Sequence, residues 1–458
     1  MTRLTDFLQS ARIELPALLW SKWGSVLFSL SVLSFLISLA LAQAFLAVAA
    51  VFYILQLLLH RPEVRFPPVK LPLTLFCLTT LASIGWAENP TVGWLAVRKL
   101  TLFVILLLGV NLVVSTKHLT VLYQGLFIES AVAGLVSLPQ FLALYQRART
   151  LHPNQFYLYM TVERVHGFMG HWMNFGGQQM LVFAALLAFL LLAKALGSGF
   201  GRWRWRGIGT ALQVPFEGGP GRGAGSAPRS PDFLTLTPES RLFWWLLLAI
   251  VILSLLLNFS RGVWLGCFVS TIYLVGRRRP RWLWALPLLM IVGLLLSPKL
   301  IRERVQSLRQ PLLDPSVSIR LEMWQVGLRM ILKHPWVGVG PNNIQEVYTL
   351  YLPSGKAPLL GYREHLHNDF IQFGAERGLP CLATWIWFMA ALGWHFRKLR
   401  GKLKDLGWVA DAAAAAWLAM LVEGCFEFNF GTSPVLMLFL FIVTTPFAAE
   451  KITVDGTL

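Results

Sequence analysis

Residues 243–276 read FWWLLLAIVILSLLLNFSRGVWLGCFVSTIYLVG, an apolar run of 34 positions with Arg261 near its middle. A helix that crosses the hydrocarbon core of a bilayer needs about 20 apolar residues, so the run is too long for one crossing. An arginine inside the hydrocarbon is also unfavourable unless it finds a polar partner or a water-filled cavity. The stretch therefore predicts two membrane helices, 243–259 and 262–276, joined by a turn that holds Arg261 at the membrane surface.

The composition of the whole chain agrees with a membrane location. The 458 residues are 56% apolar and 14% charged, whereas soluble proteins have roughly 45–50% apolar and about 25% charged residues. The net charge of +18 would suggest nucleic acid in a soluble protein, but in membrane proteins Lys and Arg collect in cytoplasmic loops. We therefore expect an all-α polytopic membrane protein with membrane lipids, and no nucleic acid, as partners.

Apolar runs of spanning length recur along the chain, and only a tight turn separates the first two. We count about twelve expected spans, at 24–41, 42–59, 71–87, 99–115, 119–145, 175–196, 243–259, 262–276, 282–298, 380–396, 408–424 and 433–449. They divide the chain into nine membrane helices within 1–298, a large external loop at 299–379, and three further helices with a tail in 380–458. A smaller external loop is expected at 146–174.

Basic residues are distributed unevenly between the loops, and this distribution predicts the orientation. With the N-terminus in the cytoplasm, the inside loops receive basic clusters such as 277–281 and 397–404, whereas the outside loops at 87–97 and 425–432 contain no Lys or Arg. This asymmetry is the one that the positive-inside rule requires. Both termini then lie inside, and the Gly-, Pro- and Arg-rich segment 197–241 is expected to be a flexible cytoplasmic loop.

The loop 299–379 has the pattern of a folded unit. Apolar side chains recur at helical spacing until the pair His334-Pro335, which is expected to end the helix. The recurring positions are Leu321, Trp324, Leu328 and Ile331. The glycines of Gly338-Val-Gly340-Pro341 lack the strand and helix of a nucleotide-binding motif, so we predict a structural turn there. Together these features predict a helical lid on the outer face.

Two arginines in external positions are candidates for binding an anion. Gly262 follows Arg261 directly and allows close backbone approach, although an arginine that reaches toward lipid headgroups is the alternative. Arg320 is expected in the first turn of the loop helix, with Ser318 as its N-cap. A cation there opposes the helix dipole, so we expect an anionic ligand, with a solvated arginine as an equal alternative.

Residues 363–372, REHLHNDFIQ, form the densest polar cluster. A glycine and a proline downstream end the segment, so 369–377 is expected to be a short helix just before the next span. His367 precedes its first turn, where imidazolium is disfavoured and a neutral nitrogen is available as a base. His365 and His367 are two positions apart, so on a regular element they point in different directions. A metal site formed by the pair is therefore not expected. An interfacial hydrogen-bonding role is an equal alternative for a histidine here.

Arg164, in the smaller external loop, is a third candidate cation, and Glu423 is a candidate counter-ion. No GxxxxGK[ST] motif, CxxC pair or metal-ligand spacing occurs, so neither a metal nor a cofactor is expected. Arginines beside a neutral histidine suit a membrane-anchored anionic leaving group, such as a polyprenyl pyrophosphate. Arginine matches phosphate oxygens in a bidentate fashion, and histidine can take the proton of an attacking sugar hydroxyl.

Motifs in residues 258–380 resemble the O-antigen ligase and polymerase superfamily, and are closest to O-antigen ligase. They are Ser260-Arg261-Gly262, RLEMW at 320–324, HPWVGVGP at 334–341, HNDFIQ at 367–372 and ERGLP at 376–380. The similarity extends over residues 160–445. RVHG at 164–167 resembles an earlier Arg–Gly segment of the family, whereas 170–174 departs from the Pro-Asn pattern usual there.

The resemblance implies a GT-C-like glycosyltransferase of the bacterial inner membrane whose active site opens to the periplasm. Such an enzyme moves a glycan from undecaprenyl pyrophosphate to an acceptor, without metal and with inversion at the anomeric carbon. The resemblance assigns His367 as the catalytic base and Arg261 and Arg320 as ligands of the pyrophosphate. Arg164, His365 and Asn368, which corresponds to the family's asparagine after the histidine, are further substrate-binding candidates.

Several alternatives stay open at this point. Lipid A-core as acceptor would make the chain a ligase, which the motif set favours; a second lipid-linked glycan would make it a polymerase, and a Ser or Thr a protein O-oligosaccharyltransferase. A transporter of an anion or lipid is a more distant alternative, but the chain shows no internal repeat, and its suspicious charges lie at the outer interface. A non-catalytic scaffold would be favoured if Arg261, Arg320 and His367 failed to converge.

Overall fold

A computed structural model describes residues 17–193, 238–306, 315–353, 357–359 and 364–456. Every regular element in these residues is a helix, as expected. The segment 197–241 lies largely outside them. The helices of the main bundle are α2 (Ala17–Val32), α3 (Leu39–His60), α4 (Lys70–Ile84), α5 (Pro90–Val97), η1 (Arg98–Phe103), α6 (Val104–Leu112), α7 (Thr116–Leu151), α9 (Trp172–Leu192), α10 (Pro238–Leu257), α11 (Arg261–Arg278), η4 (Pro280–Trp284), α12 (Ala285–Leu296), α16 (Asp369–Lys402), α17 (Gly407–Glu423) and α18 (Ser433–Val454).

Each of the twelve expected spans coincides with a helix or a pair of consecutive helices, but not all of these are of spanning length. Eight helices in the described residues are long and apolar enough to cross a membrane. α4 has 15 residues and α12 has 12, which falls short of the roughly 17 at the lower end of the spanning range. The chain is a multi-pass membrane protein; eight of the twelve expected crossings coincide with a described helix of spanning length and composition, and the other four stay predictions.

The centre of the bundle is formed by α9 and α18, which pack with α17. Within their apolar windows 83% of α9 and 89% of α18 is buried, against 22% of α3. A helix that is apolar on all sides is stable in the interior, whereas α3 presents side chains such as Val51 and Leu58 outward. The outer helices therefore supply the surface toward the lipid.

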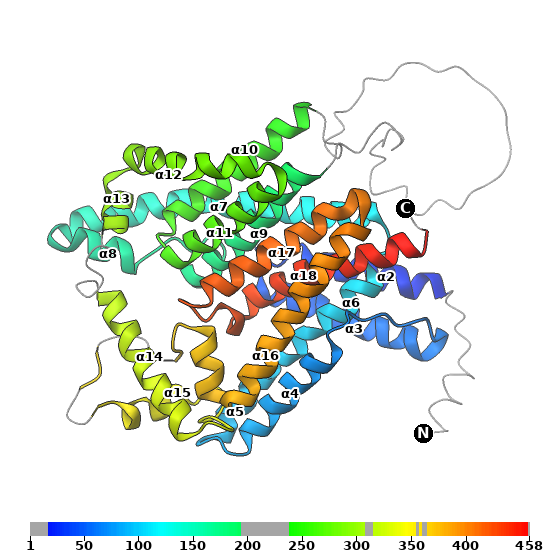
Figure 1. Cartoon of the computed structure of the whole chain (residues 1–458), viewed down its shortest axis with the longest axis horizontal. Coiled ribbons are helices and arrows are strands. Elements are labelled where there is room, and N and C mark those ends of the chain that lie inside the picture. The colour runs from blue at the N-terminus through cyan, green and yellow to red at the C-terminus, as the bar shows by residue number, and fades with distance from the viewer. Residues whose placement is uncertain (1–16, 194–237, 307–314, 354–356, 360–363, 457–458) are drawn as a thin grey trace.

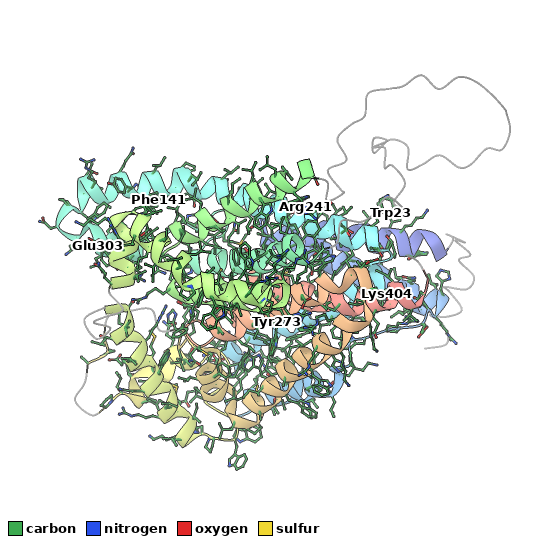
Figure 2. All side chains as sticks on the ribbon, turned by 45° about the horizontal axis from the view of Figure 1, so that its top comes forward. Trp23, Phe141, Arg241, Tyr273, Glu303 and Lys404 are labelled. Atoms are coloured by element: carbon green, nitrogen blue, oxygen red, sulfur yellow. The ribbon has the colours of Figure 1, made fainter. Side chains whose placement is uncertain are left out.

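The two ends of the molecule differ in structure. α2 begins and α18 ends at the right of Figure 1, whereas a second group of helices lies at the left. Trp23 and Lys404 lie together at one end in Figure 2, and Glu303 lies at the other. The second group consists of α8 (Phe156–Val162), α13 (Lys299–Gln306), α14 (Pro315–Lys333), α15 (Ile344–Val347) and η7 (Tyr348–Tyr351).

α14 ends at Lys333, directly before His334-Pro335, as predicted, but it begins at Pro315. Ser318 is therefore inside the helix and not its N-cap, and Arg320 lies in the second turn rather than the first. The sequence did carry a marker for this start, because proline is favoured at the first helical position and Pro315 occupies it.

The buried face of α14 is also not the predicted stripe. Met323, Val326 and Met330 are buried in a small apolar core, whereas Leu328 is 51% exposed. Leu321 and Trp324, on a second stripe of α14, instead line a cavity together with Arg320.

The glycine-rich segment 334–341 is the structural turn that was predicted. Its backbone pairs with the short helix at the start of α16: the Val339 N–H donates to the Ala375 carbonyl at 2.9 Å, and the Gly340 N–H to that of Glu376 at 2.8 Å. A Cβ on Gly338 would lie 2.3–2.4 Å from backbone atoms of Glu376 and Arg377, so the approach requires glycine. The turn thereby fixes the segment 369–377 against the rest of the loop.

Candidate functional site

His367 and Glu427 form the centre of the candidate site. The imidazole Nδ1 lies 2.5 Å from Oε2 of Glu427, across 60 positions of sequence. The Glu427 side chain is 2% exposed and that of His367 is 17% exposed. The buried Glu427 carboxylate thus holds His367, whose side chain stays partly exposed.

The charge state of Glu427 decides which nitrogen of His367 is free. Burial alone would raise the pKa of the Glu427 carboxyl, but the positive charge of Arg320 and the interaction with His367 outweigh it and lower the pKa to about 2. An ionised carboxylate only accepts hydrogen bonds, so Nδ1 of His367 carries the proton. In the neutral imidazole, Nε2 then holds a lone pair and can act as a base.

Arg320 contacts the other oxygen of the same carboxylate. Its guanidinium Nη2 donates to Oε1 of Glu427, and its side chain is 20% exposed. Glu427 therefore connects the base candidate, just before α16, with the cation on α14. The long side chain of Arg320 reaches from the second turn of the helix to this position.

Arg261 lies in the same neighbourhood. It is the first residue of α11 and donates from Nη2 to the Ser316 hydroxyl at 3.0 Å. Arg261 and Arg320 line one cavity of about 460 Å³ together with Trp264 and Trp324. The other lining residues are mainly apolar: Gly262, Leu265, Phe268, Met290, Val305, Val317, Leu321 and Phe426. We name this the arginine cavity: two guanidinium groups in an otherwise apolar space.

Arg164 and Arg304 extend the positive region. The Arg164 guanidinium stacks 3.8 Å above the Trp172 ring and donates to the Thr161 carbonyl. Burial lowers the pKa of Arg164 to about 9, and the positive charges of Arg304, Arg320 and Arg261 add to this effect. Arg304 is 3% exposed and donates to the Phe259 carbonyl at 3.3 Å. Guanidinium groups gathered in this way favour an anion in their midst.

His365 lies beside His367 and lines a different cavity from Arg261 and Arg320. The two imidazole centroids are 4.7 Å apart. Burial and the neighbouring His367 lower the pKa of His365 to about 3, so it is neutral near pH 7. It lines a different cavity of about 850 Å³, which we name the polar cavity. Asn174, at the end of the segment that departs from the family pattern, also lines it.

The side chain of Asn368 forms its hydrogen bonds within the protein. Its side-chain oxygen accepts from the Ile371 N–H at 2.9 Å as the N-cap of α16, and its Nδ2 donates to the Cys425 carbonyl at 2.8 Å. The Asp369 N–H also donates to the Gly424 carbonyl at 2.7 Å. These bonds tie the start of α16 to the loop that carries Glu427. Asn368 therefore has the contacts of a positioning residue.

The backbone at the site is held in a rarely populated conformation. His367 has φ of 48°, and Phe259, two residues before Arg261, has φ of 54°. Non-glycine residues in the left-handed region carry strain that the surrounding structure must compensate, and such residues cluster at functional sites. The bonds of Asn368 and Asp369 supply that compensation next to His367.

Glu423 is not the counter-ion that the sequence suggested. Its Oε1 accepts from Asn429 Nδ2 at 2.7 Å, while Glu427 contacts Arg320. Sequence reasoning missed Glu427 and Arg304. Glu427 stands in a short loop that was noted only for its lack of Lys and Arg, and the lone acidic charge in it was the one available signal.

Residues 246–386 match the family model described as O-antigen ligase. The match covers 141 of the 458 residues and supports membership of the chain in the O-antigen ligase superfamily. No curated protein matches the sequence. The matched segment runs from α10 into α16 and contains Arg261, Arg304, Arg320 and the 365–368 cluster, whereas Glu427 lies beyond it. The O-antigen ligase segment thus receives its central carboxylate from another part of the chain.

The variant Glu427→Gln tests the role of this carboxylate. Glutamine keeps the size of the side chain but removes the charge that stabilises imidazolium, so we expect kcat for glycan transfer to fall by about 10²–10⁴-fold. Glu423→Gln is the matched control, because its amide oxygen can still accept from Asn429. Equal losses in both variants would show a general effect of buried carboxylates and would contradict the assigned role.

The depressed pKa of Glu427 predicts how the stability of the protein changes with pH. Because the folded pKa of Glu427 is depressed from 4.5 to about 2, its contribution is complete above pH 4.5 and is lost as the pH falls toward 2. The difference in melting temperature between wild type and Glu427→Gln is therefore expected to shrink as the pH is lowered from about 5 toward 2. A difference that stays constant over that range would contradict a depressed pKa of Glu427.

Proposed function

We propose that this chain is a metal-independent inverting glycosyltransferase that moves a glycan from undecaprenyl pyrophosphate to lipid A-core on the periplasmic face of the inner membrane. The observation that supports this most is the bridge of Glu427 between His367 and Arg320. Through this bridge the base candidate His367 is linked to Arg320, which lines the arginine cavity, and that cavity suits a lipid pyrophosphate. The basic clusters at 277–281 and 397–404 support the orientation with both termini in the cytoplasm.

The proposed reaction is one displacement. Nε2 of His367 takes the proton from an acceptor hydroxyl, and the hydroxyl oxygen forms a bond to the anomeric carbon. The bond from that carbon to the pyrophosphate oxygen breaks on the opposite face, and its electron pair stays on the pyrophosphate. Attack from the opposite face inverts the configuration. Glu427 stabilises the imidazolium that forms.

The arginine cavity fits the donor. As the glycosidic bond breaks, the pyrophosphate gains negative charge, and Arg261 and Arg320 are placed to stabilise it. Planar guanidinium groups bind phosphate oxygens in a bidentate fashion. The apolar residues around them, such as Trp264 and Phe268, suit the first isoprene units of the lipid.

A transfer assay with three acceptors tests the proposal. Purified protein receives undecaprenyl-pyrophosphate glycan with lipid A-core, with more lipid-linked glycan, or with a Ser- and Thr-containing peptide. We expect a shifted lipid A-core band. Lengthening of the lipid-linked glycan would identify a polymerase, and glycosylated peptide would identify a protein O-oligosaccharyltransferase. Transfer to none of the three would contradict the proposal and favour the transporter alternative.

A chelator tests whether the arginines support glycan transfer without a divalent metal. Because the arginines supply the positive charge that a divalent metal would otherwise provide, we expect EDTA to leave the transfer rate within about twofold of its untreated value. EDTA saturated with magnesium is the control for effects of the chelator on the membrane. A loss of transfer that added divalent metal restores would contradict metal independence.

A further inference from the structure

A second lipid-facing groove lies between α3 and the segment from α5 to α6. It has a volume of about 710 Å³. From α3 it is lined by Leu39, Gln43, Leu46, Ala47 and Ala50. These positions lie on one face of the helix and extend over about 16 Å, roughly half the thickness of the hydrocarbon core. The groove therefore has the length of part of a lipid chain.

Two cations lie in this otherwise mainly apolar groove. Arg98 and Lys99, the first residues of η1, line it beside Leu95 and Leu102. Arg98 is exposed, whereas Lys99 is partly buried. The ammonium of Lys99 forms no hydrogen bond or ion pair with a side chain that the structure describes, and the carboxylates of Glu376 and Glu364 act on it only at longer range. A partly buried ammonium is stabilised by an anion, and a lipid-facing groove favours an anion that is attached to a lipid.

The groove continues into the polar cavity. Leu39, Lys99 and Ser433 line both spaces, so Lys99 stands where the apolar groove meets the polar cavity. The polar cavity is rich in amides and carboxyl groups, which suit sugar hydroxyls. These residues are Asn174, Asn342, Gln345, Glu346, Glu364 and Gln372. The apolar groove is thus followed by Lys99, and Lys99 by the polar cavity, which His365 also lines.

The two cavities approach His367 through different neighbours. Arg320 and Glu427 connect His367 with the arginine cavity, and His365, whose ring centroid lies 4.7 Å from that of His367, lines the polar cavity. If the arginine cavity holds the donor, the polar cavity is the place from which an acceptor hydroxyl approaches the base.

We propose that the groove and the polar cavity together bind the acceptor, a membrane glycolipid that carries a phosphate monoester, with its chain in the groove, its phosphate at Lys99 and Arg98, and its sugars in the polar cavity. This inference rests on the proposed glycosyltransferase function. The paired guanidinium groups of Arg261 and Arg320 match the two phosphates of a pyrophosphate, whereas Lys99 is the single partly buried cation of the groove, beside the exposed Arg98, and suits one phosphate group.

Binding measurements on the protein in phosphatidylcholine nanodiscs test the proposal. The probes are lipid A-core with its phosphates, the same lipid after enzymatic dephosphorylation, and undecaprenyl pyrophosphate. We expect Lys99→Glu to weaken binding of phosphorylated lipid A-core by at least about tenfold, the loss typical of a charge-assisted contact. Binding of the dephosphorylated lipid and of undecaprenyl pyrophosphate should stay unchanged. Lys99→Arg should retain most of the affinity and shows that the fold tolerates substitution here.

Lys70→Glu is the matched control, because Lys70 is an exposed lysine at the start of α4 that lines none of these cavities. Equal binding of the two forms of lipid A-core, or equal effects of Lys99→Glu and Lys70→Glu, would overturn the proposal. So would a loss confined to undecaprenyl pyrophosphate, which would assign the groove to a pyrophosphate lipid.

The same variants separate this inference from the function on which it rests. Normal transfer by Lys99→Glu with an unchanged KM for the acceptor would overturn the groove assignment and leave the transferase intact. Wild-type protein that binds phosphorylated lipid A-core through Lys99 yet transfers glycan to no acceptor would support the groove as a lipid site and contradict the proposed function.

Discussion

His367→Ala is expected to reduce glycan transfer by about 10²–10⁴-fold, the contribution typical of a general base. The donor should bind as in wild type, because the arginine cavity does not include the imidazole. The reason for the loss is specific to Nε2, which Glu427 leaves as the unprotonated nitrogen. The measurement is kcat at saturating acceptor, with donor affinity determined separately.

Two histidines serve as controls for this variant. His365→Ala should have a milder effect, because that imidazole lines the acceptor side and lacks the contact to Glu427. His334→Ala, in the exposed turn after α14, should leave transfer unchanged. Equal losses in His365→Ala and His367→Ala would contradict the choice of His367 as the base.

Arg320→Ala is expected to lower transfer by at least about 10²–10³-fold, the loss seen when one group that stabilises transition-state charge is removed. Two effects combine in this variant. The pyrophosphate loses a bidentate partner, and the buried Glu427 carboxylate loses a compensating charge. The measurement is kcat/KM for the donor.

Arg320→Lys separates charge from geometry. Lysine keeps the positive charge but loses the planar fork, so we expect it to rescue transfer poorly. Arg329→Ala on the same helix is the matched control, since Arg329 donates to the Tyr351 carbonyl, a contact unrelated to the cavity. Full activity of Arg320→Lys would show that only the charge matters and would contradict bidentate binding of the pyrophosphate.

Local features of the candidate site followed from the sequence. The short helix at 369–377 was predicted, and Gly378, with φ of 81°, breaks α16 where it was expected to end. The end of α14 at His334-Pro335 was predicted for the same reason. Prolines, glycines and capping residues act within a few positions of themselves, so a single sequence reveals them.

Long-range features of the site could not be predicted. Glu427 meets His367 across 60 positions and Arg320 across 107, and these contacts depend on how α14, α16 and the loop after α17 pack. The chain offers other carboxyl groups in external positions, and the sequence suggested Glu423, one helical turn away. Helix length was hidden for a related reason, because an apolar run such as 71–87 does not reveal that its helix has only 15 residues.

The most direct test of the central claim is the release of undecaprenyl pyrophosphate measured together with glycan on the acceptor in a single reaction. If His367, Glu427 and Arg320 form a glycosyltransferase site, each transferred glycan should release one molecule of undecaprenyl pyrophosphate, and both products should disappear together in His367→Ala. Movement of intact lipid-linked glycan across the membrane without release of undecaprenyl pyrophosphate would contradict the account and identify a transporter.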